Sequence, residues 1–276
     1  MRAGILCYSL MLTALLFSCK KGDLDKPAPK PQIAAPSMIL KGISTGIGTD
    51  IGGYFVGLPS SYDQAATQYP LILFFHGGGQ FGNGEVDLPN LLSEGIPALL
   101  DTKSFPAIIN AGGKVYSFIV LAPQFRSYPN NTDIQTFLDF AKANYRIDSS
   151  RIYVTGFSLG AKIACDYAGE NPKKIAALVP MAWASIDELE KKCKNISDNK
   201  LPVWAFHNLQ DELISVNDTK NFIGAINSLD PVVVPRLTIF DQSTALMKHD
   251  AWTRATDPSY RENGMNIYEW MLQFKR

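Results

Sequence analysis

The sequence of 276 residues is short of several residue types, and each shortage excludes a class of protein. Lys and Arg together number 26, as do Asp and Glu, so the net charge is zero and no basic face for nucleic acid is implied. The chain has only four cysteines and three histidines, without a C-x-x-C pair or a histidine cluster, so no metal site is indicated. No apolar run reaches the roughly 20 residues that a membrane-spanning helix needs.

The longest apolar run lies at the N-terminus and has the features of an export signal. Ile5–Phe17 is almost wholly apolar and follows the positive charge of Arg2, a pattern typical of signal peptides. The run ends in Leu-Phe-Ser-Cys, which resembles a bacterial lipobox and implies that residues 1–18 are removed and Cys19 is lipidated. We therefore expect a lipoprotein of the bacterial cell envelope, periplasmic or on the cell surface, held in the membrane by acyl chains. An ordinary secretory signal that happens to contain a cysteine is the alternative.

Residues 19–37 are predicted to be a disordered tether. This segment mixes charges of both signs and has four prolines between positions 27 and 36, a composition that favours an extended chain without a core. The remainder, 38–276, contains no internal repeat and is predicted to be one catalytic domain.

Within that domain, predicted strands alternate with predicted helices. The continuous apolar runs at 70–75 and 117–123 are typical of strands that are buried on both faces. A repeated strand-then-helix order predicts an α/β fold with a mostly parallel sheet and helices on both faces. We expect strands at 54–59, 70–75, 117–123, 151–155, 175–181, 201–206 and 236–240, and helices at 134–145, 161–168, 219–229 and 266–274, with Thr132 and Asp133 as candidate caps of the first helix.

A candidate nucleophile lies between one of these strands and the next helix. Gly156-Phe157-Ser158-Leu159-Gly160 has the G-x-S-x-G form of a sharp strand-to-helix turn, which holds a serine hydroxyl out of the backbone. Side chains at 156 and 160 would collide with neighbouring backbone, so glycine is needed at both positions. The helix N-terminus beside Ser158 also favours developing negative charge. A glycine-rich turn that only packs closely against the sheet is the alternative.

Two backbone segments are candidates for binding a substrate oxyanion. His76-Gly77-Gly78-Gly79 directly follows the 70–75 strand, and its glycines let backbone N–H groups approach a substrate oxygen. We expect one donor from Gly77 or Gly78 and the second from the N–H of Leu159, just after the nucleophile. His76 itself is expected to stabilise this loop.

The three histidines leave one candidate for the general base. His76 precedes Ser158, and His207 ends a predicted strand before any plausible acid, so His249 is the histidine in the right place. Asp211, on the loop after the 201–206 strand, is the preferred acid, which would fix the imidazole tautomer. Its competitors are Glu212, Asp218 and Asp241.

Together these motifs resemble those of the secreted α/β-hydrolase esterases, in particular the polyhydroxybutyrate-depolymerase-like and feruloyl- or acetyl-xylan-esterase-like branch. Residues 202–211, Pro-Val-Trp-Ala-Phe-His-Asn-Leu-Gln-Asp, are similar to that branch's Pro-Val-Trp-x-Phe-His-Gly-x-x-Asp, and the resemblance extends over about 50–276. Asn208 replaces the usual glycine, at a position expected to tolerate positive φ with either residue. The resemblance implies hydrolysis of a small-molecule or polysaccharide-linked ester through an acyl-enzyme, without a cofactor or metal.

The substrate cleft is the least defined part of the site. Only a brief connection separates Trp183 from residue 201, so we expect no large lid and an open cleft. Phe81, Phe157, Trp183 and Trp252 flank the motifs and are candidate cleft residues, although ordinary core packing explains each of them equally well.

Three other questions stay open at this point. A serine peptidase of the prolyl-oligopeptidase type is one alternative, although the chain leaves no room for the added domain typical of those enzymes. A non-catalytic surface binding protein on the same scaffold is the other. Cys165 and Cys193 could pair outside the cytoplasm, but Cys165 lies on a predicted buried helix, where a free cysteine serves as a small hydrophobe.

Overall fold

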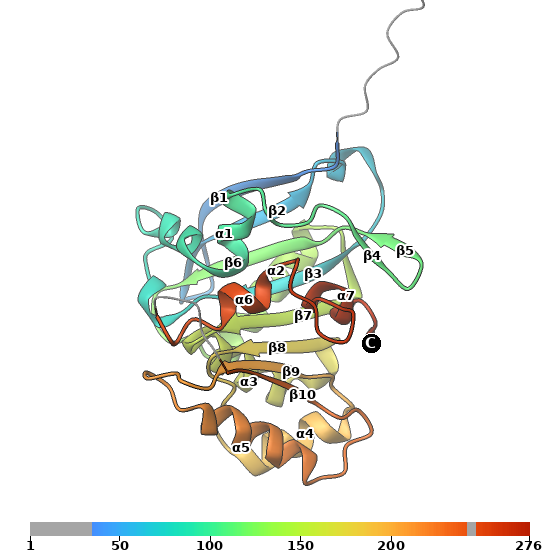
Figure 1. Cartoon of the computed structure of the whole chain (residues 1–276). Coiled ribbons are helices and arrows are strands. Elements are labelled where there is room, and N and C mark those ends of the chain that lie inside the picture. The colour runs from blue at the N-terminus through green and yellow to red at the C-terminus, as the bar shows by residue number, and fades with distance from the viewer. Residues whose placement is uncertain (1–34, 242–246) are drawn as a thin grey trace, which may run out of the picture. The chain divides into compact units, whose positions relative to one another are not determined.

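The computed structural model describes residues 35–241 and 247–276, and residues Pro36–Arg276 form one compact unit. Its centre is an eight-stranded sheet in the order β1-β2-β6-β3-β7-β8-β9-β10 (Figure 1). All neighbouring pairs are parallel except β1–β2 and β2–β6. The strands are β1 (Met38–Ile47), β2 (Ile51–Pro59), β3 (Tyr69–Phe75), β6 (Ile119–Phe125), β7 (Ile147–Phe157), β8 (Ala177–Met181), β9 (Trp204–Asn208) and β10 (Arg236–Phe240); β4 (Ile109–Ala111) and β5 (Lys114–Tyr116) form a separate hairpin.

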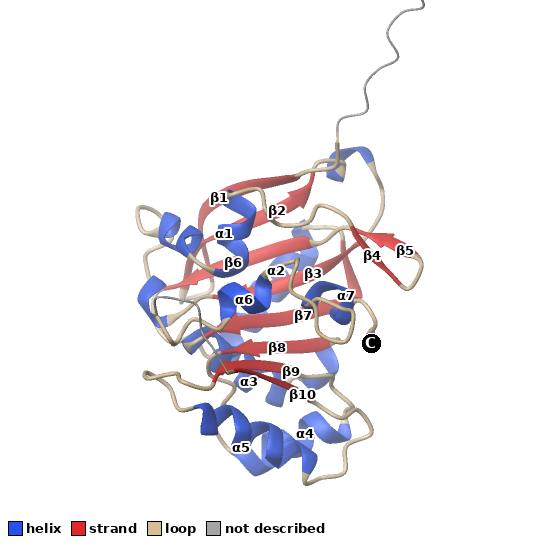
Figure 2. Ribbon diagram, viewed as in Figure 1, coloured by secondary structure: helices blue, strands red, loops and turns tan. Residues whose placement is uncertain are grey.

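Helices cover both faces of the sheet, and each face has its own hydrophobic core (Figure 2). Along β3, Leu71, Leu73 and Phe75 pack on one face, while Ile72 and Phe74 pack on the other, as the alternation of side chains in a strand requires. The first face is covered by α2 (Asn131–Asn144), α3 (Leu159–Glu170), α4 (Leu189–Asp198) and α5 (Val216–Asn227), and the second by α1 (Gly95–Asp101), α6 (Trp252–Thr256) and α7 (Ile267–Met271).

This architecture confirms the predicted α/β fold with a mostly parallel sheet. Several element bounds differ from the prediction. The 201–206 strand begins only at Trp204, because residue 202 is a proline whose carbonyl accepts from Leu178 while its nitrogen has no proton to donate. The 266–274 helix is reduced to Ile267–Met271.

The N-terminal cap of α2 is Asn130; of the two predicted caps, Asp133 takes part as the partner of Asn130, whereas the prediction of Thr132 was wrong. The Asn130 side chain accepts from the backbone N–H groups of Thr132 and Asp133, and Asp133 in return accepts from the Asn130 N–H. This reciprocal pair is a capping box, which satisfies N–H groups that have no acceptor inside the helix.

Both described cysteines, Cys165 and Cys193, are free and fully buried, so the disulfide alternative is not formed. They lie on α3 and α4 within the same core, and burial raises the pKa of each thiol, that of Cys193 to about 11. Both therefore behave as small hydrophobes.

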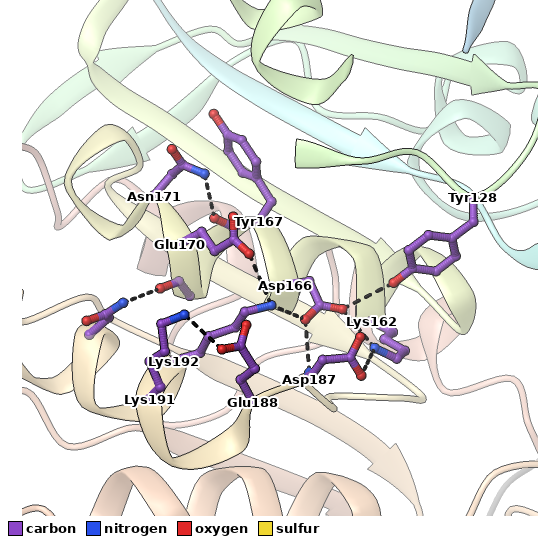
Figure 3. Close-up of polar contacts among 12 residues, drawn as sticks. Tyr128, Lys162, Asp166, Tyr167, Glu170, Asn171, Asp187, Glu188, Lys191 and Lys192 are labelled. Carbon is purple, nitrogen blue, oxygen red and sulfur yellow. Dashed lines mark hydrogen bonds and ion pairs between the residues drawn. The ribbon is translucent and has the colours of Figure 1, made fainter. Parts of the chain in front are cut away.

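A buried ion network joins α3 to α4 (Figure 3). Asp166 on α3 accepts hydrogen bonds from Lys192 of α4 and from Lys162, both at 2.8 Å. The backbone N–H of Asp187 and the hydroxyl of Tyr128 also donate to it. Because Lys192 is only 4% exposed, it depends on Asp166 for its main counter-charge.

Candidate active site

Ser158 lies in a strained turn between β7 and α3. Its φ of 52° and ψ of −126° are sparsely populated by residues other than glycine, and such a conformation costs about 1–3 kcal/mol. A Cβ at position 160 would lie 2.2 Å from the Phe75 carbonyl oxygen, and one at position 156 would lie 2.6 Å from the Gly160 carbonyl oxygen. Only glycine at both positions lets the helix start so close to the sheet, as the sequence predicted.

The structure brings the three predicted triad residues into one hydrogen-bonded chain. Nε2 of His249 lies 2.9 Å from the Ser158 hydroxyl, and Nδ1 lies 2.6 Å from Oδ2 of Asp211. Oδ1 of Asp211 accepts the backbone N–H groups of Leu213 and Ile214, both at 2.9 Å. The Asp211 side chain is fully buried, and four N–H groups lie against its carboxylate: two backbone amides, the His249 ring and the ring of His207.

None of the competing acids takes this position. Glu212 pairs with Lys248, and its side chain is 72% exposed, unlike the buried Asp211 carboxylate. Asp218 lies in the first turn of α5, and Asp241 is exposed at the end of β10.

Two backbone N–H groups in the segments around Ser158 are free to bind an oxyanion. Leu159 is the first residue of α3, and Gly78 is the first residue of a short 3₁₀-helix (Gly78–Gln80), so neither N–H has an acceptor inside its own helix. A Cβ on Gly78 would lie 3.5 Å from Leu159, which shows that the two segments adjoin. Gly77, the other candidate donor, gives its N–H to the Gln80 side chain at 3.3 Å, so the structure favours Gly78.

The glycine loop is held by buried side chains. Nδ1 of His76 donates to the Gly77 carbonyl at 2.8 Å, and Nε2 accepts the Phe125 N–H at 3.1 Å. Burial lowers the pKa of His76 to about 4, so the ring stays neutral near neutral pH and can make both bonds. Gln124, fully buried, bonds the Gly84 N–H and the Gln80 carbonyl.

A cavity of about 490 Å³ opens onto Ser158 and His249. Phe157 and Trp252 line it as expected, with ring centroids 4.3 Å apart and planes inclined at 31°. Phe81 and Trp183 are not among its lining residues, so their prediction as cleft residues was wrong. Phe81 packs edge-on against His76 in the core instead.

Other residues of this cavity were not predicted from the sequence. Glu94 contributes a carboxylate, and Leu213 and Met247 contribute an exposed apolar rim. Burial and the nearby Asp250 raise the pKa of Glu94, against the opposing effect of His249. Among the described lining residues there is no lysine or arginine. Nothing in the local sequence links Glu94 to a site formed by residues 64 to 155 positions later.

Asn208, which departs from the family pattern, has a structural role. It lies in β9 outside the left-handed region, so the expected positive φ was wrong. Its side-chain amide donates to the Lys248 carbonyl at 2.7 Å and so holds the residue before His249. A glycine could not make this bond.

In the described residues, no group of three or more His, Cys, Asp and Glu side chains is arranged to hold a metal ion. No helix in the same part of the chain is long and apolar enough to cross a bilayer.

Comparison with known proteins points to one fold. The model of the Dienelactone hydrolase family matches residues 124–234. A protein named alpha/beta hydrolase L404 from Acanthamoeba polyphaga mimivirus is 31% identical over 116 residues, covering 37% of this chain and 44% of that protein. The bifunctional acetylxylan esterase/xylanase XynS20E of Neocallimastix patriciarum is 24% identical over 178 residues, covering 64% of this chain and 24% of that protein. The chain thus spans less than half the length of these curated relatives.

Solved structures agree on the architecture. A thermostable esterase superposes with a TM-score of 0.60 at 20% identity, covering 87% of this chain and 64% of that one. The fluorophosphonate-binding serine hydrolase F of Staphylococcus aureus gives 0.58 at 14% identity, covering 87% and 99%. A ferulic acid esterase gives 0.55 at 16% identity, covering 80% and 96%. At these identities the likeness establishes the α/β-hydrolase fold.

Proposed function

We propose that this chain, an α/β-hydrolase by fold, is a serine carboxylic-ester hydrolase that works through an acyl-enzyme on Ser158. The observation that supports this most is the chain of hydrogen bonds from Ser158 through His249 to the buried Asp211. It begins at a strained turn beside two backbone N–H groups whose helices offer them no acceptor. A nucleophile, a base, an orienting acid and an oxyanion site are the parts that acyl transfer requires.

The geometry supports the following sequence of steps. As the Ser158 oxygen attacks the ester carbonyl, its proton passes to Nε2 of His249, and Asp211 stabilises the resulting imidazolium. The oxyanion accepts hydrogen bonds from the Gly78 and Leu159 N–H groups. Collapse of the intermediate breaks the carbon–oxygen bond, and His249 gives the proton to the leaving alcohol. Water, deprotonated by His249, then attacks the acyl-enzyme. As the bond to the Ser158 oxygen breaks, His249 returns the proton to that oxygen, and the acid is released.

The cavity favours an ester whose acyl group is uncharged. Phe157 and Trp252 are buried in its wall and pack against each other, and Leu213 and Met247 add an apolar rim that is 70% and 57% exposed. Glu94 would repel an anionic acyl group and can accept a hydrogen bond from a hydroxyl. An open cavity suits esters carried on a larger molecule, so acyl or feruloyl esters of polysaccharides are the proposed class; relatives named as an acetylxylan esterase/xylanase and a ferulic acid esterase support it.

Labelling with a fluorophosphonate probe tests the nucleophile. Wild-type protein should be labelled, whereas Ser158→Ala should not be labelled and should lose on the order of 10⁶-fold in kcat for a nitrophenyl ester. A correctly folded wild type that stays unlabelled would refute the proposal and favour a binding protein on the same scaffold.

A panel of acetyl, feruloyl and longer-chain esters, together with matched amides, tests the bond that is cleaved. We expect esters to be cleaved far faster than amides, with feruloyl or acetyl esters preferred over long acyl chains. Faster turnover of the amides would favour the peptidase alternative.

A further inference from the structure

A second imidazole, which the proposed mechanism does not use, lies against the triad carboxylate. Nε2 of His207 is 3.0 Å from Oδ2 of Asp211, the same oxygen that lies 2.6 Å from Nδ1 of His249. The side chains of His207 and Asp211 are both fully buried. His207 is the penultimate residue of β9, and Asp211 follows it by four residues, so the turn after the strand brings the carboxylate back onto the ring.

The contacts of His207 define where its proton lies. Nε2 faces two acceptors, the Asp211 carboxylate and the Ile214 carbonyl at 3.2 Å, so this nitrogen must carry the proton. Nδ1 lies 2.7 Å from the Thr219 hydroxyl and therefore accepts the hydroxyl proton. The Thr219 oxygen in turn accepts the backbone N–H of Ala184 at 3.0 Å.

The order of donors thus runs in one direction, from Ala184 through Thr219 and His207 to Asp211. Burial lowers the pKa of His207, against the effect of the Asp211 carboxylate. The neutral ring with a single proton on Nε2 is the form that satisfies every one of these contacts.

We propose that His207 is a positioning residue that fixes the orientation of the Asp211 carboxylate for His249. This inference rests on the proposed function. Oδ1 is fixed by two backbone N–H groups, and Oδ2 is shared by two imidazoles. Without His207, Oδ2 loses one of its two donors, and the carboxylate can turn or admit water into a buried position. His249 then loses its alignment with Ser158, although no group that touches substrate has changed.

Substituting His207 with asparagine or with glutamine distinguishes a positioning role from a role in packing alone. A glutamine side chain reaches about as far as Nε2 of histidine and can still donate to Asp211, whereas an asparagine reaches only as far as Nδ1 and can contact Thr219 alone. His207→Asn should therefore reduce kcat by about 10²-fold, since misalignment of a catalytic group has this effect. KM should change little, because His207 is not among the lining residues of the cavity.

His207→Gln is the matched variant and should restore most of kcat, to within about tenfold of wild type. Both variants remove the ring from a fully buried position, so we expect both to lower the melting temperature, His207→Asn somewhat more because its side chain is one methylene shorter. A role in packing alone would lower the stability of both and leave kcat of the folded fraction unchanged.

Thr219 allows a second test that leaves His207 in place. Thr219→Val removes the hydroxyl that holds Nδ1 and frees the ring to change tautomer, whereas Thr219→Ser keeps the hydroxyl. We expect kcat of Thr219→Val to fall about tenfold and that of Thr219→Ser to stay near wild type. This pair decides the question if the His207 variants do not fold.

The inference is overturned if folded His207→Asn and Thr219→Val both retain wild-type kcat, or if His207→Gln loses as much kcat as His207→Asn at equal stability. Failure of the proposed function looks different, because then the wild type itself does not react with a fluorophosphonate. A wild type that is labelled, with His207→Asn labelled at the same rate, refutes only the role of His207.

Discussion

Glu94 is the one carboxylate among the described residues that line the cavity beside Ser158 and His249. It belongs to the segment between the glycine loop and α1, and its side chain is only partly exposed. Its charge would therefore act on any acyl group bound in the cavity. We expect the wild type to prefer neutral esters over anionic ones of the same length.

Glu94→Gln tests this preference with two nitrophenyl esters, a butyrate and a succinate monoester. Removing the charge should raise kcat/KM for the anionic ester relative to the neutral one by roughly three- to tenfold, the scale of a partly screened charge pair. Protonation of Glu94 removes the repulsion, so the wild type's preference for the neutral ester should decline as the pH falls. Since the pKa of Glu94 is raised, this decline should begin at a pH above the ordinary pKa of a glutamate. The ratio of the two substrates cancels the pH dependence that they share. An unchanged ratio in Glu94→Gln would show that the carboxylate does not face the acyl group.

Catalytic residues could be predicted from the sequence where their order along the chain leaves few candidates for each role. Ser158 was set by the glycines around it, and His249 by elimination among three histidines. His207 and Glu94 were missed for a different reason. Their roles depend on which way a turn folds after β9 and on which loop covers the cavity, and neither is a local property of the sequence.

At the scale of elements, the close approach of α3 to β3 is the feature on which the nucleophile depends. A Cβ on Gly160 would lie 2.2 Å from the Phe75 carbonyl oxygen and 2.5 Å from that of His76, so the helix would have to move away from the sheet. Backbone atoms cannot yield as a flexible side chain can. Gly160→Ala should therefore destabilise the fold by about 1–3 kcal/mol, as overpacked substitutions do, and should also reduce kcat.

Gly224→Ala is the matched control for this prediction. Gly224 lies within α5, where a Cβ would meet nothing within 4 Å, so alanine should stabilise the protein by up to about 1 kcal/mol through its helix propensity. Urea unfolding of the two variants measures both effects. Equal stability of the two would contradict the close contact at residue 160.

The ion network between α3 and α4 makes stability depend on pH. Burial alone would raise the pKa of Asp166, but hydrogen bonds from Lys162 and Lys192 outweigh it and lower that pKa. A carboxyl group with a lowered pKa contributes stability above its unfolded pKa, about 3.9, and this contribution is lost as the pH falls through the folded value. The network should therefore stabilise the protein at neutral pH and fail in acid.

Asp166→Asn should destabilise the protein at pH 7 by about 3–5 kcal/mol, because it leaves the buried Lys192 without its main partner. The loss relative to wild type should shrink as the pH falls from about 4, where the carboxyl of the unfolded chain becomes protonated, towards the lowered pKa of folded Asp166. Asp198→Asn removes an exposed partner of Lys194 on the same helix and should cost less than about 1 kcal/mol. Thermal unfolding between pH 3 and 7 measures both variants. A constant deficit of Asp166→Asn across this range would contradict the lowered pKa.

Sequence patterns predicted the buried elements better than the exposed ones. The strands that became β3 and β6 contain continuous apolar runs, and the structure buries every residue of both. β1 was missed because it is an edge strand with mostly exposed residues, and α4 because few of its ten residues are apolar. Hydrophobic patterns in a sequence indicate which elements are buried, so half-exposed elements are harder to predict from them.

For the whole molecule, the site lies where four segments leave the carboxyl ends of strands in the parallel part of the sheet. The glycine loop follows β3, Ser158 follows β7, Asp211 follows β9, and His249 follows β10. Sequence order alone predicted this succession, since each βα unit returns the chain to the same edge of the sheet. It could not predict that β6 lies between β2 and β3, because lateral strand order is set by pairings far apart in the chain.

The predicted export signal would determine where the protein acts. Residues 1–34 lie outside the described part of the structure, so lipidation of Cys19 and the cell-envelope location stay predictions. When the full chain is produced in a Gram-negative host with radiolabelled palmitate, the wild type should be labelled and should sediment with membranes. Cys19→Ser should lose the label, whereas Cys7→Ser, within the apolar run, should keep it.

The catalytic part should not need this anchor. Residues Pro36–Arg276 form one compact unit that contains the whole Ser158–His249–Asp211 chain of hydrogen bonds. A truncated chain that begins at Pro36 should therefore be soluble and should hydrolyse a small nitrophenyl ester with unchanged kcat/KM. On vesicles that carry a surface-bound ester, however, the lipidated protein should be faster, because anchoring by its acyl chains raises its local concentration. A truncated chain that folds but is inactive, when the full chain is active, would show that the site needs residues before 36. For the separate labelling experiment, palmitate incorporation by Cys19→Ser would refute the lipobox assignment.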